Sequence, residues 1–119
     1  MTVEVVGAPA PALSDILFDL DQATLRPDAL SILAAAVKAL SDSPARRVQI
    51  DGHASEDGGA EYNRTLSERR ANAVRDYLVS QGIDPSRITT MSYGETQPRY
   101  DNSQEATRRL NRRAVLVIR

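Results

Sequence analysis

A single arginine in the middle of an apolar helical stripe constrains the fold more than any other feature of the sequence. The stripe recurs at helical spacing from Tyr62 to Leu78, and a rotation of about 100° per residue puts Arg70 near its centre, one turn from Leu66 and Val74. A guanidinium keeps its proton and is costly to bury without an anionic, hydrogen-bonding partner. We therefore expect a carboxylate to meet Arg70, supplied by the chain itself or by a ligand.

An internal ion pair is the more common explanation for a buried arginine. A binding role is the second interpretation, because charged groups in unusual environments also gather at functional sites. The sequence around Arg70 leaves both open at this point. The aspartates available for an internal pair are Asp19, Asp21, Asp51 and Asp57.

Composition excludes several classes of protein. The chain has 119 residues, of which 41% are hydrophobic and 26% charged, as is typical of one globular domain. No apolar run approaches the ~20 residues that cross a bilayer, and the opening Met1–Glu4 lacks the features of a signal peptide. We therefore expect membrane contact or export only through segments outside this sequence. The formal net charge of -1 gives no general attraction to nucleic acid, so no nucleic-acid partner is expected.

Two parts of the chain differ in composition. Residues 1–12 end in a run of alanine and proline and are predicted to form an N-terminal linker or extension, and residues 13–119 are predicted to form the domain proper. Alternating or continuous apolar residues predict strands, and apolar residues at helical spacing predict helices. The predicted strands are 16–18, 48–51, 88–93 and 114–118, and the predicted helices are 27–43, 60–81 and 104–110.

The order of these elements predicts the fold class. Strands and helices alternate as β-α-β-α-β-α-β, and the unbroken apolar run Ala114–Ile118 is expected at the centre of the sheet. We expect an α+β fold, a two-layer α/β sandwich with one four-stranded mixed sheet and helices packed on one face.

Catalytic and metal-binding functions find little support in the sequence. His53 and Ser55 lie two residues apart beside Glu56, but no Gly-x-Ser-x-Gly motif is present, so the protein is not expected to be an enzyme. His53 is expected to form hydrogen bonds within its loop or to pack at the strand end. With one histidine, no cysteine and no calcium-loop motif, no metal and no cofactor are expected.

Ordered motifs cover nearly all of the chain from Ile16. They are Phe18–Asp21, Val48–Ala54, Glu61–Asn63, Leu66–Val74, Ser92–Glu95 and Asn111–Val117. In this order and at these separations they resemble the OmpA C-terminal family of peptidoglycan-binding domains. The resemblance implies the fold given above and non-covalent binding of the peptide stem of the cell wall.

The resemblance also implies a ligand and two partners for it. In this family the ligand is the diaminopimelate side chain of the stem peptide. Its carboxylate is held by the arginine that corresponds to Arg70, and its ammonium by an aspartate fifteen residues earlier, where this chain has Ser55. Replacing a charged hydrogen bond of ~1.5–3 kcal/mol by a neutral one of ~0.5–1.5 kcal/mol should weaken binding by roughly tenfold.

Further ligand contacts follow from the same resemblance, and each has a structural alternative. Asp19 and its neighbours Phe18 and Leu20 would cradle the ligand, although Asp19 could instead be the internal partner of Arg70. Asn63 would contact the ligand or brace the adjacent loop. Leu66 would form an apolar wall or belong to the core.

Two carboxylates flank Ser55 and could replace the missing aspartate. Glu56 and Asp57 lie in a loop that Gly58 and Gly59 make adaptable, so either could turn toward the ligand's ammonium. The favoured alternative is that both face solvent or pair with arginines. Arg112 and Arg113 are expected to brace the fold rather than to touch ligand.

Two functions remain open. The first is an anchor domain that binds diaminopimelate-type peptidoglycan in the periplasm, within a larger outer-membrane-associated protein. The second is a periplasmic scaffold of the same fold that has weakened or lost wall binding and meets protein partners, such as Tol-type proteins. A ligand site would leave Arg70 exposed at the floor of a pocket facing Ser55, whereas a scaffold could fill that pocket with Asp19, Asp57 or a loop side chain.

Overall fold

The computed structural model describes residues 11–119. Most of the predicted linker 1–12 therefore lies outside the described residues, and its boundary stays a prediction. The strands are β1 (Ile16–Leu17), β2 (Val48–Gly52), β3 (Ile88–Ser92) and β4 (Arg113–Ile118). The helices are α1 (Ala29–Asp42), α2 (Ala60–Ser80), α3 (Glu105–Arg108) and the two 3-10 turns η1 (Pro85–Arg87) and η2 (Arg109–Asn111).

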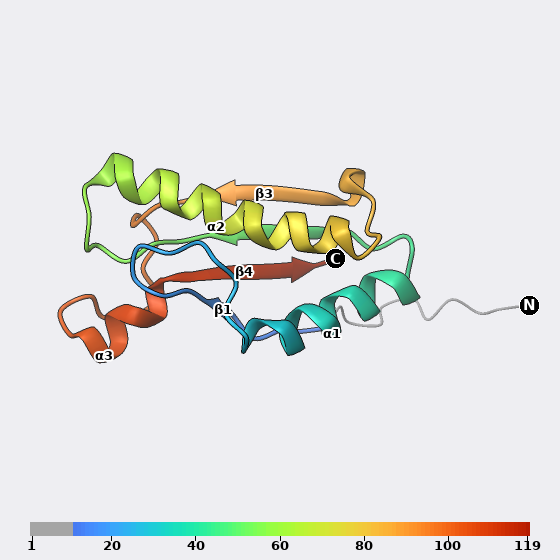
Figure 1. Ribbon diagram of the computed structural model, residues 1–119, viewed down its shortest axis with the longest axis horizontal. Coiled ribbons are helices and arrows are strands. Elements are labelled where there is room, and N and C mark those ends of the chain that lie inside the picture. The colour runs from blue at the N-terminus through green and yellow to red at the C-terminus, as the bar shows by residue number, and fades with distance from the viewer. Residues whose placement is uncertain (1–10) are drawn as a thin grey trace, which may run out of the picture.

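The four strands form one mixed sheet in the order β1-β4-β2-β3. β4 pairs antiparallel with both β1 and β2, while β2 and β3 run parallel, as Figure 1 shows. The apolar strand at the C-terminus thus lies inside the sheet, which confirms its predicted central position. Ala114, Leu116 and Ile118 are buried, and Val115 and Val117 on the other face are half-buried, so apolar residues occupy both faces of the strand.

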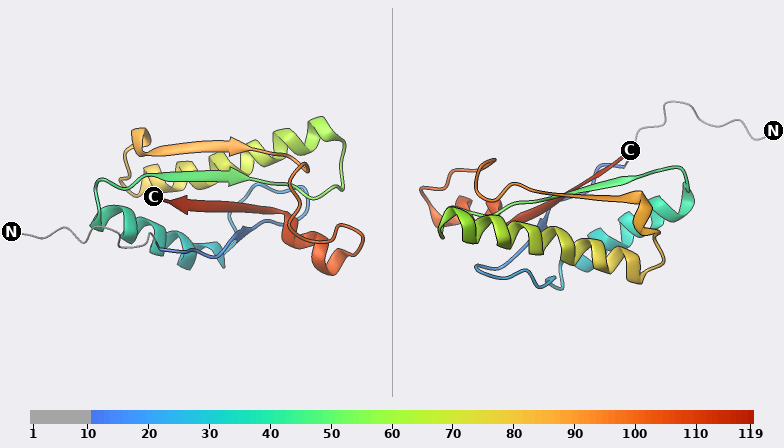
Figure 2. Two further views of the ribbon diagram at one scale, coloured as in Figure 1. Left: turned by 180° about the vertical axis from the view of Figure 1, so that it is seen from behind. Right: turned by 90° about the horizontal axis from the view of Figure 1, so that it is seen from above.

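The two long helices cover the same face of the sheet, as the right-hand view of Figure 2 shows. α3 lies at the end of the sheet where β4 begins (Figure 1). The core between the layers consists mainly of aliphatic side chains from α1, α2, β2 and β4, among them Leu33, Leu40, Ile50, Val74 and Leu116. The predicted two-layer α+β architecture is confirmed.

The element boundaries differ from the predicted ones by a few residues. α1 begins at Ala29 rather than at Pro27, because the backbone N–H groups of Ala29 and Leu30 donate to carbonyls of a preceding turn. The predicted third helix is divided into α3 and a 3-10 turn. α2 ends before Gly82, whose φ of 94° suits a glycine that terminates a helix.

Among residues 11–119, no helix combines the length and the apolar character that crossing a membrane requires.

Candidate functional site

Arg70 lies fully buried on the inner face of α2, with 0% of its surface exposed. Its guanidinium donates three hydrogen bonds, all to backbone carbonyls. Nε donates to Gln22 at 2.9 Å, one terminal nitrogen to His53 at 3.0 Å, and the other to Asp19 at 3.1 Å. Two of these carbonyls belong to residues 19–22, between β1 and α1. We call these residues the covering segment, because they lie over the Arg70 side chain.

No carboxylate oxygen of the described residues lies within ion-pair distance of Arg70. The expected internal partner Asp19 contributes only its carbonyl, and its carboxylate pairs with Arg26 at 3.5 Å. Of the two alternatives for the carboxylate, the internal one is not found among the described residues, because loop carbonyls occupy the positions around the guanidinium. The expectation of an exposed Arg70 at a pocket floor is wrong for this structure.

The charge of Arg70 is poorly compensated. Phe18 packs against it, with the guanidinium carbon 5.3 Å from the ring centre, an arrangement that favours a cation. Burial and then the nearby charge of Arg112 lower the pKa of Arg70 to about 10. The group remains charged at pH 7, and only three of its five N–H donors have partners among the described residues. Its positive charge therefore has no anionic partner within ion-pair distance among residues 11–119.

Ser55 does not face Arg70 but belongs to a polar network around Arg112, in which Ser55 and Arg112 are buried. Its hydroxyl donates to Asp57 and accepts a hydrogen bond from Arg112 Nε at 3.1 Å. A terminal nitrogen of Arg112 also donates to Asp57 at 2.9 Å and to Glu105 at 2.7 Å. The polar partners of Ser55 in this structure are therefore Asp57 and Arg112, and not Arg70.

Asp57 takes the favoured alternative and pairs with arginines. Besides Arg112 it contacts Arg108 at 3.4 Å. Although partial burial opposes the shift, hydrogen bonds from Ser55 and Arg112 hold the pKa of Asp57 below its ordinary value. Glu56 is exposed. Neither carboxylate points unpaired toward Arg70.

Asn63 braces the loop before α2. Its side-chain amide donates to the carbonyl of Gly58 at 3.1 Å and to the carboxylate of Glu95 at 3.0 Å. With 2% of its surface exposed and both donors used, Asn63 has the structural role that the sequence left open. It ties the loop after β2 to the loop after β3.

Of the remaining predicted site residues, Leu66 belongs to the core and Leu20 is exposed near the start of α2. Leu66 is buried at 7% exposure, and Leu20 is 48% exposed. Beside Leu20, the hydroxyl of Tyr62 donates to Asp21 at 3.1 Å, which fastens the covering segment to the start of α2. Asp21 has a φ of 58°, a left-handed conformation that aspartate tolerates in tight turns.

His53 packs at the end of β2, as expected. Its ring stacks on Tyr93 with centroids 5.3 Å apart, and only 4% of its surface is exposed. Burial, with the charges of Arg113 and Arg99, lowers the pKa of His53 to about 4, so the ring is neutral at pH 7. Its carbonyl, which the sequence analysis did not single out, is one of the three acceptors at Arg70.

Sequence reasoning missed the three backbone carbonyls at Arg70 and the Arg112 network as parts of the site. A backbone carbonyl such as that of Gln22 is present in every residue, so the side-chain sequence could not predict which carbonyl accepts from Arg70. The network did have a signal in the closely spaced arginines 108, 109, 112 and 113. Within residues 11–119 no group of three or more acidic, histidine or cysteine side chains is arranged to hold a metal ion.

Comparisons with known proteins agree with this fold and these motifs. Residues 17–112 match the OmpA family, and the chain belongs to that family. It is 41% identical over 103 residues to a peptidoglycan-associated lipoprotein from Brucella melitensis, covering 87% of this chain and 61% of the relative. It is 39% identical over 104 residues to outer membrane porin F from Pseudomonas fluorescens, covering 87% of this chain and 32% of that protein.

A solved structure shows the same fold. The crystal structure of the peptidoglycan-associated lipoprotein from Burkholderia pseudomallei superposes with a TM-score of 0.85 at 31% identity, covering 88% of this chain and 89% of that one. The chain spans less than two thirds of the length of the two sequence relatives. It is thus an OmpA-like domain of the cell-envelope class, a class of non-enzymatic domains.

Proposed function

We propose that this domain binds the peptide stem of peptidoglycan non-covalently and so anchors a larger envelope protein to the cell wall. The observation that carries the proposal is Arg70, a fully buried guanidinium with no carboxylate of the described residues in ion-pair contact. An isolated buried charge is expensive. A ligand carboxylate would supply the missing negative charge.

Binding at Arg70 requires an exchange of acceptors. The carbonyls of Asp19 and Gln22 lie 3.1 and 2.9 Å from the guanidinium, in a segment that the Tyr62–Asp21 hydrogen bond holds to α2. A carboxylate forms stronger hydrogen bonds to arginine than a neutral carbonyl does. In the proposed complex the covering segment moves outward, and the ligand's carboxylate accepts the hydrogen bonds of Arg70 that the two carbonyls accepted before.

Diaminopimelate is the proposed ligand because its side chain carries such a carboxylate. The ammonium of the same side chain meets Ser55 rather than an aspartate. Because Ser55 already contacts Arg112 and Asp57, we expect the ammonium end to contribute little binding energy. The rim formed by Leu20 and Tyr62, each 48% exposed, provides apolar contact around the entrance.

The names of the relatives support a place in the envelope. One is a peptidoglycan-associated lipoprotein and another an outer membrane porin. We infer that this domain is periplasmic and belongs to a protein associated with the outer membrane. Periplasmic proteins of the Tol type are a second proposed class of partner.

A specific observation favours the scaffold as a second candidate function. The covering segment closes over Arg70, and Ser55 faces Arg112 instead of Arg70. If the covering segment does not move, the fold serves protein partners without touching the wall.

A heteronuclear NMR titration with a diaminopimelate-containing muropeptide separates the two. For wall binding we expect saturable shifts in the amides of the covering segment 19–22, of His53 and of Arg70. A muropeptide with lysine in place of diaminopimelate is the matched ligand control, since it lacks the distal carboxylate, and it should bind at least about tenfold more weakly. Equal binding of the two muropeptides would refute the assignment of the carboxylate to Arg70.

The matched variants are Tyr62→Phe and Tyr77→Phe. The first removes the hydrogen bond to Asp21 that closes the covering segment, so muropeptide binding should strengthen. The second alters another tyrosine of the same helix, which packs against the core, and should leave binding unchanged. No saturable shift in either the parent chain or Tyr62→Phe would support the scaffold instead.

A further inference from the structure

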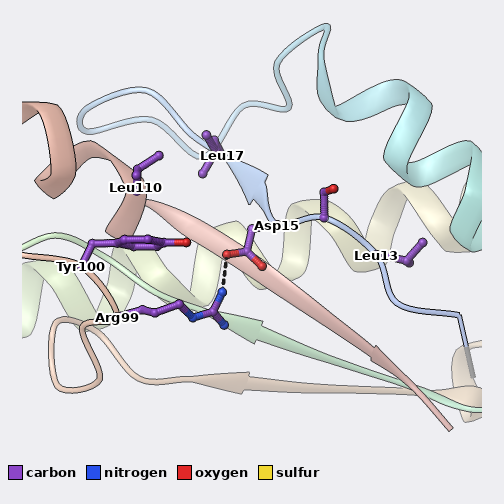
Figure 3. A pocket seen from close by; sticks show the side chains of 7 residues that line it. Leu13, Asp15, Leu17, Arg99, Tyr100 and Leu110 are labelled. Atoms are coloured by element: carbon purple, nitrogen blue, oxygen red, sulfur yellow. Dashed lines mark hydrogen bonds and ion pairs between the residues drawn. The ribbon is translucent and has the colours of Figure 1, made fainter.

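A pocket lies on the face of the sheet opposite to α1 and α2. We call it the Asp15–Arg99 pocket, and Figure 3 shows it from close by. Its volume is about 330 Å³. It is lined by Leu13, Ser14, Asp15, Leu17, Arg99, Tyr100 and Leu110.

This pocket and Arg70 lie on opposite faces of β1. Successive side chains of a strand point to opposite faces, so Phe18 lies against Arg70 while Leu17 lines the pocket. Across the antiparallel ladder Leu17 is opposite Arg113, which places Arg113 beneath the same face. The pocket is therefore separate from the proposed wall-binding site.

Two guanidinium groups share one carboxylate in this pocket. Arg99 donates to Asp15 at 2.8 Å, the interaction dashed in Figure 3, and Arg113 Nε lies 3.7 Å from the same carboxylate oxygen. Within ion-pair distance of Asp15 there are thus two positive charges for one negative charge, and Asp51 is a further acidic group that acts on Arg113 from longer range.

Arg113 carries a buried polar atom that lacks a hydrogen-bond partner. Its Nε has none in the described part of the chain, although only 3% of Arg113 is exposed. Its two terminal nitrogens make long hydrogen bonds of 3.4 and 3.3 Å to Asn111 and Gln97. Burial and the charge of Arg99 lower the pKa of Arg113. An additional anion near Asp15 would relieve this excess of positive charge.

The walls of the pocket are held in place before any ligand arrives. The side-chain oxygen of Asn111, a residue with 0% exposure, accepts hydrogen bonds from the backbone N–H groups of Arg99 and Tyr100 at 3.1 and 3.0 Å. Its amide donates to the carbonyl of Tyr100 at 2.9 Å. Binding therefore needs little ordering of the loop that carries the cation.

The pocket combines that positive charge with apolar walls that solvent can reach. Leucines line it on several sides, and the ring of Tyr100 closes one end (Figure 3). The side chain of Arg99 is 48% exposed, and β1 is the outer strand of the sheet, so a segment of another protein can approach from outside. We propose that the Asp15–Arg99 pocket binds an acidic segment of a partner protein in which a carboxylate side chain neighbours a branched apolar side chain.

Three capped dipeptides test this chemistry by NMR titration of the whole chain. Acetyl-Glu-Leu-amide carries both features, acetyl-Gln-Leu-amide lacks the charge, and acetyl-Glu-Gly-amide lacks the apolar side chain. We expect saturable shifts at Leu17, Arg99, Tyr100 and Leu110 with the first peptide, and binding about tenfold weaker with each of the other two. Equal binding of the Glu and Gln peptides, or no saturable shift at about 10 mM peptide, would overturn the proposal.

Three variants sharpen the test. Arg99→Gln removes the half-exposed cation and should weaken binding of acetyl-Glu-Leu-amide about tenfold. Asp15→Asn removes the competing carboxylate and should tighten binding, a gain that an unfolded protein cannot show. Arg75→Gln removes an arginine of α2 that pairs with Asp76 and should change nothing. An equal loss of peptide affinity in Arg99→Gln and Arg75→Gln would contradict a specific site. The same shifts on concentrating the protein without peptide would also contradict the proposal, because they would identify a second copy of the chain as the occupant.

Discussion

At the scale of single residues, Arg70 shows how a buried charge can be accommodated without an ion pair. Two segments that are distant in sequence, 19–22 and the residue after β2, bring three backbone carbonyls to one guanidinium. Carbonyl dipoles satisfy the geometry of the donors but leave the net charge uncompensated. A group in that state contributes to folding, and its uncompensated charge is the basis of the proposed binding of a ligand carboxylate.

Replacing Arg70 by methionine tests how much Arg70 contributes to the stability of the fold. Arg70→Met keeps most of the side-chain volume but leaves the carbonyls of Asp19, Gln22 and His53 without a donor. We expect the free energy of unfolding to fall by about 2–4 kcal/mol, measured by urea denaturation. Arg69→Met changes the adjacent, exposed arginine and should stay within about 0.5 kcal/mol of the parent. Equal effects would contradict the assigned role of the three hydrogen bonds.

Ser55 sets the strength of the proposed wall contact. Ser55→Asp would restore a carboxylate at the position facing the ligand's ammonium in the resembled family. We expect the affinity for a diaminopimelate muropeptide to rise about tenfold, measured by isothermal titration calorimetry. Ser55→Asn adds similar bulk without charge and should not improve binding. A similar gain in both variants would show that shape rather than charge limits the affinity.

At the scale of elements, the close approach of α2 to β2 depends on one glycine. A Cβ added at Gly52 would lie 1.9 Å from the backbone carbonyl oxygen of Ser67 and 3.2 Å from the Cβ of Ala71. Helix and strand could then keep their packing only by moving apart. Since Gly52 ends the strand that leads into the His53–Ser55 segment, such a movement would also displace the site.

Gly52→Ala is therefore expected to cost about 3 kcal/mol of unfolding free energy or more, because the obstructing atoms belong to backbone. Gly59→Ala is the matched control. A Cβ there meets nothing within 4 Å, and its φ of -69° suits any residue. Because Gly59 is the N-cap of α2, where alanine is less favourable than glycine, the change should cost less than about 1 kcal/mol. Comparable midpoints for the two variants in thermal unfolding would refute the packing argument.

Most elements were predictable from sequence because helical and strand periodicity is a local property of the chain. The spacing of Leu33, Ala36 and Leu40 marks the buried side of α1, and the alternation of Val48 and Ile50 marks that of β2. The ends of elements were less predictable. The start of α1 depends on which preceding carbonyls accept its first N–H groups, and those carbonyls lie in a turn with no periodicity.

At the scale of the whole molecule, pH links the site to stability. His53 is the only histidine, and its pKa of about 4 in the fold lies below the ordinary 6.5. The unfolded chain therefore binds more protons between these values, and the free energy of unfolding must fall as the pH drops from about 6.5 to 4. Hydrogen bonds with arginines hold the pKa values of Asp57 and Glu105 low. Below that pH range these two carboxylates become protonated, and their contribution to the free energy of unfolding is lost as well.

His53→Phe is expected to remove the first of these two effects. Phenylalanine keeps a ring to stack on Tyr93 but does not titrate, so the stability lost between pH 7 and pH 4, on the order of 3 kcal/mol in the parent, should shrink to a small remainder. Urea unfolding at a series of pH values measures the difference. An unchanged pH profile would assign the loss to other groups.

The whole fold also separates two candidate surfaces. Phe18 contacts Arg70 on the helix side of β1, and Leu17 lines the Asp15–Arg99 pocket on the other side. A domain arranged in this way can hold a carboxylate ligand on one face and a protein segment on the other without competition for space.

The sequence by itself determined the order of strands and helices, the central position of β4 and the family, because these follow from apolar periodicity and from motifs at set separations. It also marked Arg70 as a buried charge in need of partners. Only the tertiary structure decided what those partners are. Asp19 supplies a carbonyl instead of a carboxylate, and Ser55 turns to Arg112, because the path of a loop depends on all the segments it packs against and backbone acceptors are the same in every residue.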